Sequence, residues 1–279
     1  MATTTSLNIA FIGGGNMASA LIAGLLAKGQ PTSLLHVVET DAEKLADFEA
    51  QGLNTYDASN IDDTKHAIEK ADVVVLAVKP QVMKDVLLPV KDSWGEQVVI
   101  SIAAGIGTDS LAEWLGPQVK LVRAMPNTPA MIQMGATGLY ATAGVNEAER
   151  QLAQQVMSAA GLVLWVDDEE LLHAVTAISG SAPAYFFYML ENMIATGEKL
   201  GLTQTQATAL AMQTALGSAQ MALTSDDTPA ELRRKVTSPN GTTQAAIEVM
   251  DDKQMHQIIA DAMLACEQRS RELSLAFGK

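Results

Sequence analysis

The sequence predicts an α/β protein in which a doubly wound domain with a largely parallel sheet is followed by an all-α domain. Strand-like and helical runs alternate as far as about residue 166, as they do when helices join parallel strands. The first strand-like run leads directly into a glycine-rich turn and a helix. After residue 167 only helical patterns remain. We therefore predict two domains, 1–166 and 167–279.

The strand-like runs of the first domain are short and apolar, as expected for strands buried on both faces of a parallel sheet. They occupy residues 7–12, 34–39, 73–78, 97–102, 119–125, 136–141 and 162–166. Helical patterns occupy residues 19–26, 42–51, 110–115 and 147–160.

The second domain is predicted to contain helices over 168–178, 183–200, 203–223, 229–235 and 243–277. Thr228-Pro-Ala-Glu231 is a capping box with proline at the first helical position, which indicates where one helix begins. The two long apolar-rich helices carry more hydrophobic surface than this domain could bury alone. We expect oligomerisation through these helices, with a monomeric bundle as the alternative.

The glycine-rich turn has the pattern G-x-G-x-x-A, formed by Gly13, Gly15 and Ala18. Gly13 permits a tight turn, Gly15 lets a pyrophosphate approach the backbone, and Ala18 keeps the helix close to the sheet. In its strand-turn-helix context the pattern indicates a Rossmann-like, dinucleotide-binding domain over 1–166. A plain glycine-rich turn is the alternative.

Ligands of doubly wound sheets bind beyond the carboxyl ends of the strands. The loops predicted to face the cofactor follow Ile12, Val78, Ile102 and Met125. In the third loop, 103–105 is Ala-Ala-Gly, small enough to approach a ligand. In the last, Asn127 lies between two prolines, and the restricted backbone there suits orientation of a nicotinamide amide.

Glu39 ends the second predicted strand, where an acidic side chain normally accepts hydrogen bonds from the adenosine ribose of NAD. Beside the 2′-phosphate of NADP its charge would cost on the order of 4 kcal/mol at about 4 Å and an effective dielectric of about 20. The sequence therefore favours NADH over NADPH, although Lys44 or a rotated Glu39 would reverse this preference.

Residues 237–243, Thr-Ser-Pro-Asn-Gly-Thr-Thr, form a hydroxyl-rich turn before a helical run. The start of a helix offers unpaired N–H groups and a partial positive charge, so this turn can hold a small carboxylate without Arg or Lys. The alternative is an ordinary helix start with Thr242 or Thr243 as its cap.

The composition favours a cytoplasmic enzyme that acts on a small molecule. The formal net charge of −14 disfavours nucleic-acid binding. No segment has the pattern of a transmembrane helix or a secretory signal. Cys266 is the only cysteine and the four histidines lack ligand spacing, so no disulfide within the chain and no metal site are expected.

Six motifs, in chain order, resemble those of pyrroline-5-carboxylate reductases. They are Phe-Ile-Gly-Gly-Gly-Asn-Met-Ala (11–18), Ala-Val-Lys-Pro-Gln (77–81), Ser-Ile-Ala-Ala-Gly-Ile (101–106), Arg-Ala-Met-Pro-Asn-Thr-Pro (123–129), Ser-Gly-Ser-Ala-Pro-Ala-Tyr (179–185) and the 237–243 turn, which is the most specific. The resemblance implies reduction of 1-pyrroline-5-carboxylate to L-proline by NAD(P)H, the last step of proline biosynthesis. It also implies a homodimer, or a ring of dimers, formed through the C-terminal helices.

The resemblance also assigns site residues. Ser238, Gly241, Thr242 and Thr243 would hold the carboxylate and ring of the substrate, with Thr243 hydrogen-bonded to the imine nitrogen. Asp226 aligns with an acidic position near the entrance of the site, although it reads equally well as a solvated loop charge. The cofactor would contact Gly13, Gly15, Asn16, Met17, Glu39, Asn60, Ala77, Val78, Lys79, Pro80 and Asn127. Asn240 departs from the glycine of many relatives, which is tolerable because Asn accepts left-handed backbone angles.

Three alternatives remain open at this point: a β-hydroxyacid-dehydrogenase-like enzyme, another imine reductase, and a non-catalytic NAD(P)-binding protein. The first requires a catalytic lysine on the first large helix of the second domain. Residues 174–190 contain no Lys, Arg, Asp, Glu or His, which makes oxidation of an alcohol hard to arrange there. A non-catalytic protein would bind the cofactor without turning over any cyclic imine.

Overall fold

A computed structural model describes residues 7–278, which divide into two compact units. Unit 1 comprises the described residues up to Ser181 together with those from Cys266 onward, and unit 2 comprises Ala182–Ala265. Residues 167–181 thus pack with the sheet. The functional boundary between residues 166 and 167 stays a prediction.

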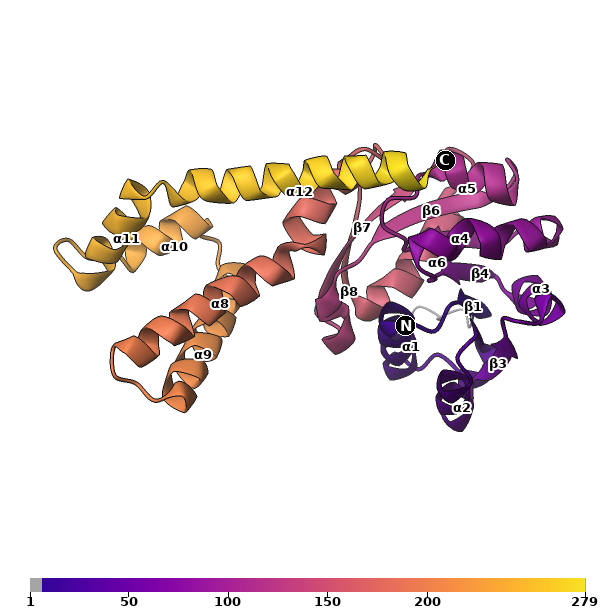
Figure 1. Ribbon diagram of the computed structural model, residues 1–279, viewed down its shortest axis with the longest axis horizontal. Helices are drawn as coiled ribbons and strands as arrows, with labels where there is room; N and C mark the ends of the chain where they lie inside the picture. Colours follow the sequence, from indigo (N-terminus) through magenta and orange to yellow (C-terminus); the bar gives the residue numbers. More distant parts are fainter. Residues whose placement is uncertain (1–6, 279) are drawn as a thin grey trace. The chain divides into compact units, whose positions relative to one another are not determined.

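Unit 1 is built on an eight-stranded sheet in the order β3-β2-β1-β4-β5-β6-β7-β8 (Figure 1). The strands are β1 (Ile9–Ile12), β2 (Leu35–Glu39), β3 (Asn54–Asp57), β4 (Val73–Leu76), β5 (Val98–Ser101), β6 (Lys120–Met125), β7 (Gly135–Ala141) and β8 (Gly161–Trp165). All neighbouring pairs are parallel except β6 and β7. The predicted doubly wound, largely parallel sheet is confirmed.

Helices cover both faces of this sheet. One apolar core includes residues of α1 (Asn16–Ala27), α2 (Ala42–Ala50) and α6 (Glu147–Met157). The other includes residues of α3 (Ile61–Lys70), α4 (Pro80–Leu87) and α5 (Thr108–Leu115). Each strand contributes side chains to both cores, because successive side chains of a strand point to opposite faces of the sheet. Short 3-10 turns are η1 (Thr32–Leu34), η2 (Leu88–Ser93), η3 (Thr128–Ile132) and η4 (Ser158–Ala160).

The sequence patterns did not predict β3, α3 or α4. β3 reads Asn-Thr-Tyr-Asp and is partly exposed at the edge of the sheet, so it lacks the apolar run by which the other strands were found. Its parallel pairing with β2 places it in the sheet through contacts distant in sequence.

After β8, α7 (Leu171–Val175) runs into a π-helical turn, η5 (Thr176–Gly180), within unit 1. The last part of α12 (Met255–Phe277) also belongs to unit 1. There Phe277 packs against the core that contains α3, α4 and α5. Among the described residues, unit 1 therefore combines those up to Ser181 with those from Cys266 onward.

Unit 2 is entirely helical. It contains α8 (Ala182–Lys199), α9 (Gln204–Thr224), α10 (Pro229–Lys235), α11 (Thr242–Asp252) and the first part of α12. The single helix predicted over 243–277 is wrong, because Lys253 and Gln254 separate α11 from α12 and Gln254 has φ +55°. No glycine or proline marks this break. In the part of the chain that the structure describes, no helix is long and apolar enough to cross a membrane.

The close packing of α1 yields a prediction. Gly24→Ala is expected to lower the free energy of unfolding by about 1–3 kcal/mol, because a Cβ there would overlap the carbonyl group of Ala159. Gly144→Ala is the matched control, since a Cβ at Gly144 meets nothing within 4 Å, and it should change stability by less than about 1 kcal/mol. Denaturant unfolding of both variants tests this, and equal losses would contradict it.

Candidate active site

The loop between β1 and α1 contains one glycine that the fold requires, Gly13, and one that it does not, Gly15. Gly13 has φ +104°, and a Cβ there would lie 2.8 Å from the carbonyl oxygen of Ala77, so the fold itself requires this glycine. Gly15 has φ −73°, and a Cβ there would meet nothing within 4 Å. Neither strain nor packing within the protein demands glycine at position 15. The open space in front of its backbone fits a pyrophosphate group.

The N-terminus of α1 adds donors to this open space. Gly15 is the N-cap and provides no side-chain hydrogen bond, and the first turn of α1 carries no acidic residue. The first N–H groups and the partial positive charge of the helix therefore remain available to an anion. Asn16 is exposed here, whereas Met17 is half-buried against the core. These residues fit the phosphates of a dinucleotide.

Glu39 is held firmly at the end of β2. One oxygen of its carboxylate accepts a hydrogen bond from Gly14 N at 2.9 Å, and the other accepts from Thr40 N at 2.7 Å and Asp41 N at 3.2 Å. Burial alone would raise the pKa of Glu39, but these backbone donors outweigh it and hold the pKa below its usual value. Lys44 Nζ lies 3.8 Å from the carboxylate. A negative charge is thus fixed beside the glycine-rich loop.

The loop after β4 lies next to the glycine-rich loop. Ala77 N donates to the carbonyl oxygen of Ile12 at 2.8 Å, and Val78 would contact a Cβ placed on Gly13. The exposed Lys79 is the N-cap of α4, and Pro80 occupies its first turn. Because β1 and β4 are parallel neighbours, these loops leave the same edge of the sheet.

Asn60 and the 103–105 loop have roles that the sequence did not reveal. Asn60 is exposed and caps α3 by accepting a hydrogen bond from Asp62 N at 3.2 Å. Gly105 has φ +77°, and a Cβ there would lie 3.0 Å from Phe277 Cδ2. The glycine in this loop therefore makes room for the end of α12. The predicted approach of the loop to a ligand stays a prediction.

Asn127 is buried, and its amide is engaged on both sides. Its Nδ2 donates to the carbonyl oxygen of Ser179 at 3.0 Å, and its Oδ1 accepts from Ala136 N at 2.8 Å. The predicted contact with a nicotinamide amide stays a prediction, because at most one amide hydrogen and one lone pair remain for a ligand.

A partly buried ion pair was missed from the sequence. Arg123 on β6 donates to the Glu169 carboxylate at 2.7 Å, and the same carboxylate accepts from Thr108 N at 2.7 Å. Glu169 thus caps the start of α5 from a distant part of the chain. No local pattern predicts such a cap, because the two residues are 61 positions apart.

The 237–243 turn lies in unit 2 and is shaped to begin a helix without a cap. Gly241 N donates to the carbonyl oxygen of Ser238 at 3.0 Å, and Asn240 has φ +59°, the left-handed conformation expected for it. The N-cap of α11 is Gly241, with no side-chain hydrogen bond and no acidic residue in the first turn. The alternative in which Thr242 or Thr243 caps the helix does not hold.

The hydroxyl groups of the turn remain available. Within residues 7–278 the structure gives the side chains of Ser238, Thr242 and Thr243 no hydrogen-bond partner. Thr243 is half-buried and Thr242 is exposed. Free hydroxyls beside free helix N–H groups can bind a carboxylate and a neutral ring nitrogen together.

Asp226 is exposed in the loop between α9 and α10. An ion pair between its neighbour Asp227 and Lys235 connects this loop to the end of α10. Within unit 2, the loop is therefore connected through Lys235 to the segment that leads into the 237–243 turn. The role of Asp226 stays a prediction.

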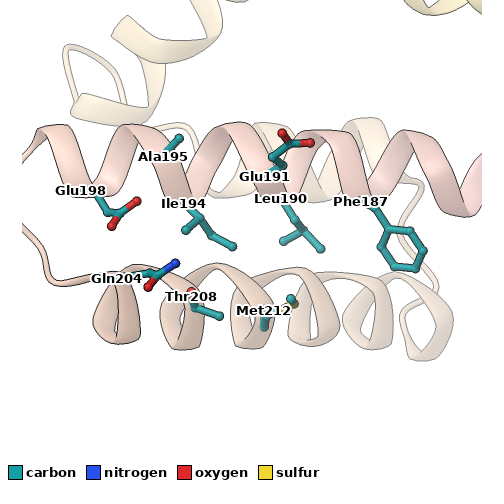
Figure 2. A pocket seen from close by; sticks show the side chains of 9 residues that line it. All are labelled: Phe187, Leu190, Glu191, Ile194, Ala195, Glu198, Gln204, Thr208 and Met212. Carbon is teal, nitrogen blue, oxygen red and sulfur yellow. The ribbon is translucent and has the colours of Figure 1, made fainter.

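An open groove of about 440 Å³ lies between α8 and α9. Figure 2 shows Phe187, Leu190 and Ile194 of α8 facing Met212 of α9 across it. None of the residues lining it belongs to the 237–243 turn. Its lining includes the carboxylates of Glu191 and Glu198, which repel a negative charge, so the groove is not the better candidate for an anionic substrate. Among the described residues no cluster of His, Cys, Asp and Glu could hold a metal ion.

Two family models match the chain, one in its N-terminal part and one in its C-terminal part. Residues 8–105 match a family model described as "NADP oxidoreductase coenzyme F420-dependent", and residues 169–273 match one described as "Pyrroline-5-carboxylate reductase dimerisation".

Individual relatives cover almost the whole chain. A pyrroline-5-carboxylate reductase of Pseudomonas aeruginosa is 48% identical over 97% of this chain and 98% of its own length. The solved structure of a pyrroline-5-carboxylate reductase from Coxiella burnetii has a TM-score of 0.91 at 41% identity, covering 97% of this chain and 99% of that one. A Plasmodium falciparum pyrroline carboxylate reductase, solved with NADP bound, has a TM-score of 0.85 at 26% identity, with 96% and 98% covered.

The contrast between the two glycines yields a prediction. Gly15→Ala should leave the thermal unfolding temperature unchanged or slightly raised, because its Cβ meets nothing in the protein. It should weaken the binding of NADH and NADPH by about tenfold or more, since the methyl group occupies the space of the pyrophosphate. Gly13→Ala, which clashes with Ala77, should lower stability instead. If a folded Gly15→Ala variant bound the nucleotides with unaltered affinity, the pyrophosphate could not lie at this position.

Proposed function

Because the chain belongs to the pyrroline-5-carboxylate reductase family, we propose that it transfers a hydride from NAD(P)H to the C=N bond of 1-pyrroline-5-carboxylate and forms L-proline. This is the last step of proline biosynthesis. The observation that carries the proposal is the uncapped start of α11, where free backbone N–H groups lie beside the free hydroxyls of Thr242 and Thr243.

The chemistry requires no strong acid or base. The hydride brings two electrons to the carbon of the C=N bond, the π electrons move to nitrogen, and a proton completes the amine. In our proposal the N–H groups at the start of α11, with Ser238, Gly241 and Thr242, hold the carboxylate, while Thr243 hydrogen-bonds the ring nitrogen. A hydroxyl is a poor proton donor near neutral pH, so positioning dominates, and the proton comes from water or from the iminium form of the substrate.

The cofactor is NAD(P)H, and we propose a preference for NADH that rests on Glu39. Four donors from Gly14, Thr40 and Asp41 hold the carboxylate, which supports a fixed charge and disfavours its rotation away from the ribose. Lys44 forms an ion pair with Glu39 at 3.8 Å but is half-exposed, so it offsets this charge only in part. A 2′-phosphate beside Glu39 would meet the negative charge that remains.

The match to a dimerisation domain indicates that the chain oligomerises. The apolar faces of α8 and α9, including Phe187 and Leu216, are largely exposed in a single copy, which supports burial against a second copy. We extend the proposal to a homodimer or a ring of dimers, in the cytoplasm and without nucleic-acid binding, as the charge of −14 favours.

Thr243→Val tests the substrate site. The change keeps the shape of the side chain and removes the hydroxyl, so kcat/KM for 1-pyrroline-5-carboxylate should fall by about 10- to 100-fold while cofactor affinity stays constant. Thr224→Val is the control, because its hydroxyl donates only to the carbonyl of Gln220 at the end of α9. Initial rates of NADH and NADPH oxidation measure both. A Thr243→Val enzyme within twofold of the unchanged protein would exclude this role.

Glu39→Gln tests the cofactor preference. It should shift the ratio of kcat/KM for NADPH to that for NADH upward by about tenfold or more. Because the pKa of Glu39 lies below its ordinary value of 4.5, the discrimination should persist through neutral pH and disappear only as pH falls below that value. Glu43→Gln makes the same charge change on exposed α2. Equal shifts in both variants would mean that net charge, and not Glu39, sets the preference.

A further inference from the structure

The two edges of the sheet in unit 1 differ in character. One edge is β3, which reads Asn-Thr-Tyr-Asp and ends in a carboxylate. The other edge is β8, which reads Gly-Leu-Val-Leu-Trp. Proteins usually protect an edge strand with charged residues or proline, because its outer backbone groups can pair with another chain. Residues 161–166 contain neither, so β8 is an apolar edge without this protection.

One face of β8 is open as well. Val163 and Trp165 pack against the core that contains α1, α2 and α6. Leu162 and Leu164 alternate with them and point to the opposite face, where they are 59% and 62% exposed. Single exposed apolar residues are ordinary, but large ones gathered on one face mark an interaction surface.

The segment that follows β8 covers the neighbouring strand but leaves β8 open. A Cβ at Gly138 of β7 would lie 2.7 Å from Cγ1 of Val175, so α7 packs on β7 at this point. Gly138 is the register partner of Leu164, and register partners point to the same face of a sheet. The cover that α7 provides therefore ends one strand short of the edge.

The outer side of this covering segment is apolar too. Leu171 of α7 and Ile178 of η5 are 48% and 67% exposed, whereas Leu172 and Ala177 are buried. Exposed apolar side chains of strand and helix thus occur on the same side of the sheet, and all of them belong to unit 1. The β8 surface, as we name it, consists of Leu162, Leu164, Leu171 and Ile178.

Charge and family membership favour a second copy of the chain as the occupant of the β8 surface. Residues 161–181 contain no Lys or Arg and include four consecutive acidic residues, 167–170, which would repel anionic lipid or nucleic acid. The family model for dimerisation matches residues 169–273. It therefore begins within unit 1 and includes Leu171 and Ile178. An interface that starts there continues onto the open face of β8.

We propose that the interface between two copies of this chain includes the β8 surface as well as the exposed helices of unit 2. The inference rests on the proposed homodimer. In a twofold dimer the same surface is buried on both copies, which removes the apolar side chains and the unprotected edge from water together. Assembly thereby protects an edge that the sequence leaves unprotected.

Leu164→Lys tests the β8 surface by placing a charge within it. The dissociation constant of the dimer, measured by sedimentation equilibrium, should rise by about tenfold or more. Leu88→Lys is the matched control, because Leu88 is also an exposed leucine of unit 1 but lies in η2, which packs with α3, α4 and α5. The control should keep the dissociation constant within about threefold. An equal change in both variants would contradict the proposal.

Hydrogen exchange of the unchanged protein gives a second test, which decides the question if Leu164→Lys does not fold. Above the dissociation constant of the dimer, the backbone amides of residues 161–166 should exchange about tenfold or more slowly than below it. The amides of β3, at the other edge, should exchange equally at both concentrations. Exchange at residues 161–166 that does not depend on concentration would overturn the inference.

Failure of the proposed homodimer is detected separately. An unchanged chain that stays monomeric at every concentration would exclude the homodimer and the β8 surface with it. A dimer that tolerates Leu164→Lys would exclude only the β8 surface. Oxidation of NADH in the presence of 1-pyrroline-5-carboxylate tests the proposed reaction independently of both.

Discussion

The candidate site depends on two helix starts that the protein leaves without caps. The N-cap side chains of α2, α3, α6, α9 and α10 cap their helices, whereas the N-cap residues of α4, α5 and α7 do not. The N-caps of α1 and α11 are Gly15 and Gly241, which offer no side-chain hydrogen bond. With glycine as the N-cap, each of these starts forgoes roughly a few tenths of a kcal/mol of helix stability. In return it presents N–H groups and a partial positive charge to an anion, and these two helices follow the two motifs that first indicated a site.

This arrangement explains how a strongly acidic chain can bind anionic ligands. With a net charge of −14, the long-range field repels phosphates and carboxylates. Backbone N–H groups act only at contact distance, so they bind a correctly placed anion without attracting others. The carboxylates of Glu39 and Glu169 accept hydrogen bonds from backbone N–H groups within the protein. At Glu39 the same bonds fix the charge that would discriminate between the two cofactors.

The sequence predicted those features whose cause is local. Neighbouring residues determine the apolar strands that alternate with helices, the G-x-G-x-x-A turn and the left-handed backbone of Asn240. The structure contains all three features. Features with distant causes were missed. A Cβ at Gly105 would meet Phe277, Glu169 caps α5 from 61 positions away, and Asn127 donates to the carbonyl oxygen of Ser179. The break at Gln254 has no local signal, since neither glycine nor proline occurs there.

The 237–243 turn contains no titratable side chain, which limits the ways in which it could accelerate a reaction. Residues 237–243 contain no Asp, Glu, His, Lys, Arg or Cys, so a proton-transfer group cannot account for rate enhancement at this place. Reduction of a C=N bond needs none, because the electrophile already exists once its nitrogen is protonated or hydrogen-bonded. What remains is geometry, which the buried and hydrogen-bonded groups around a site must maintain.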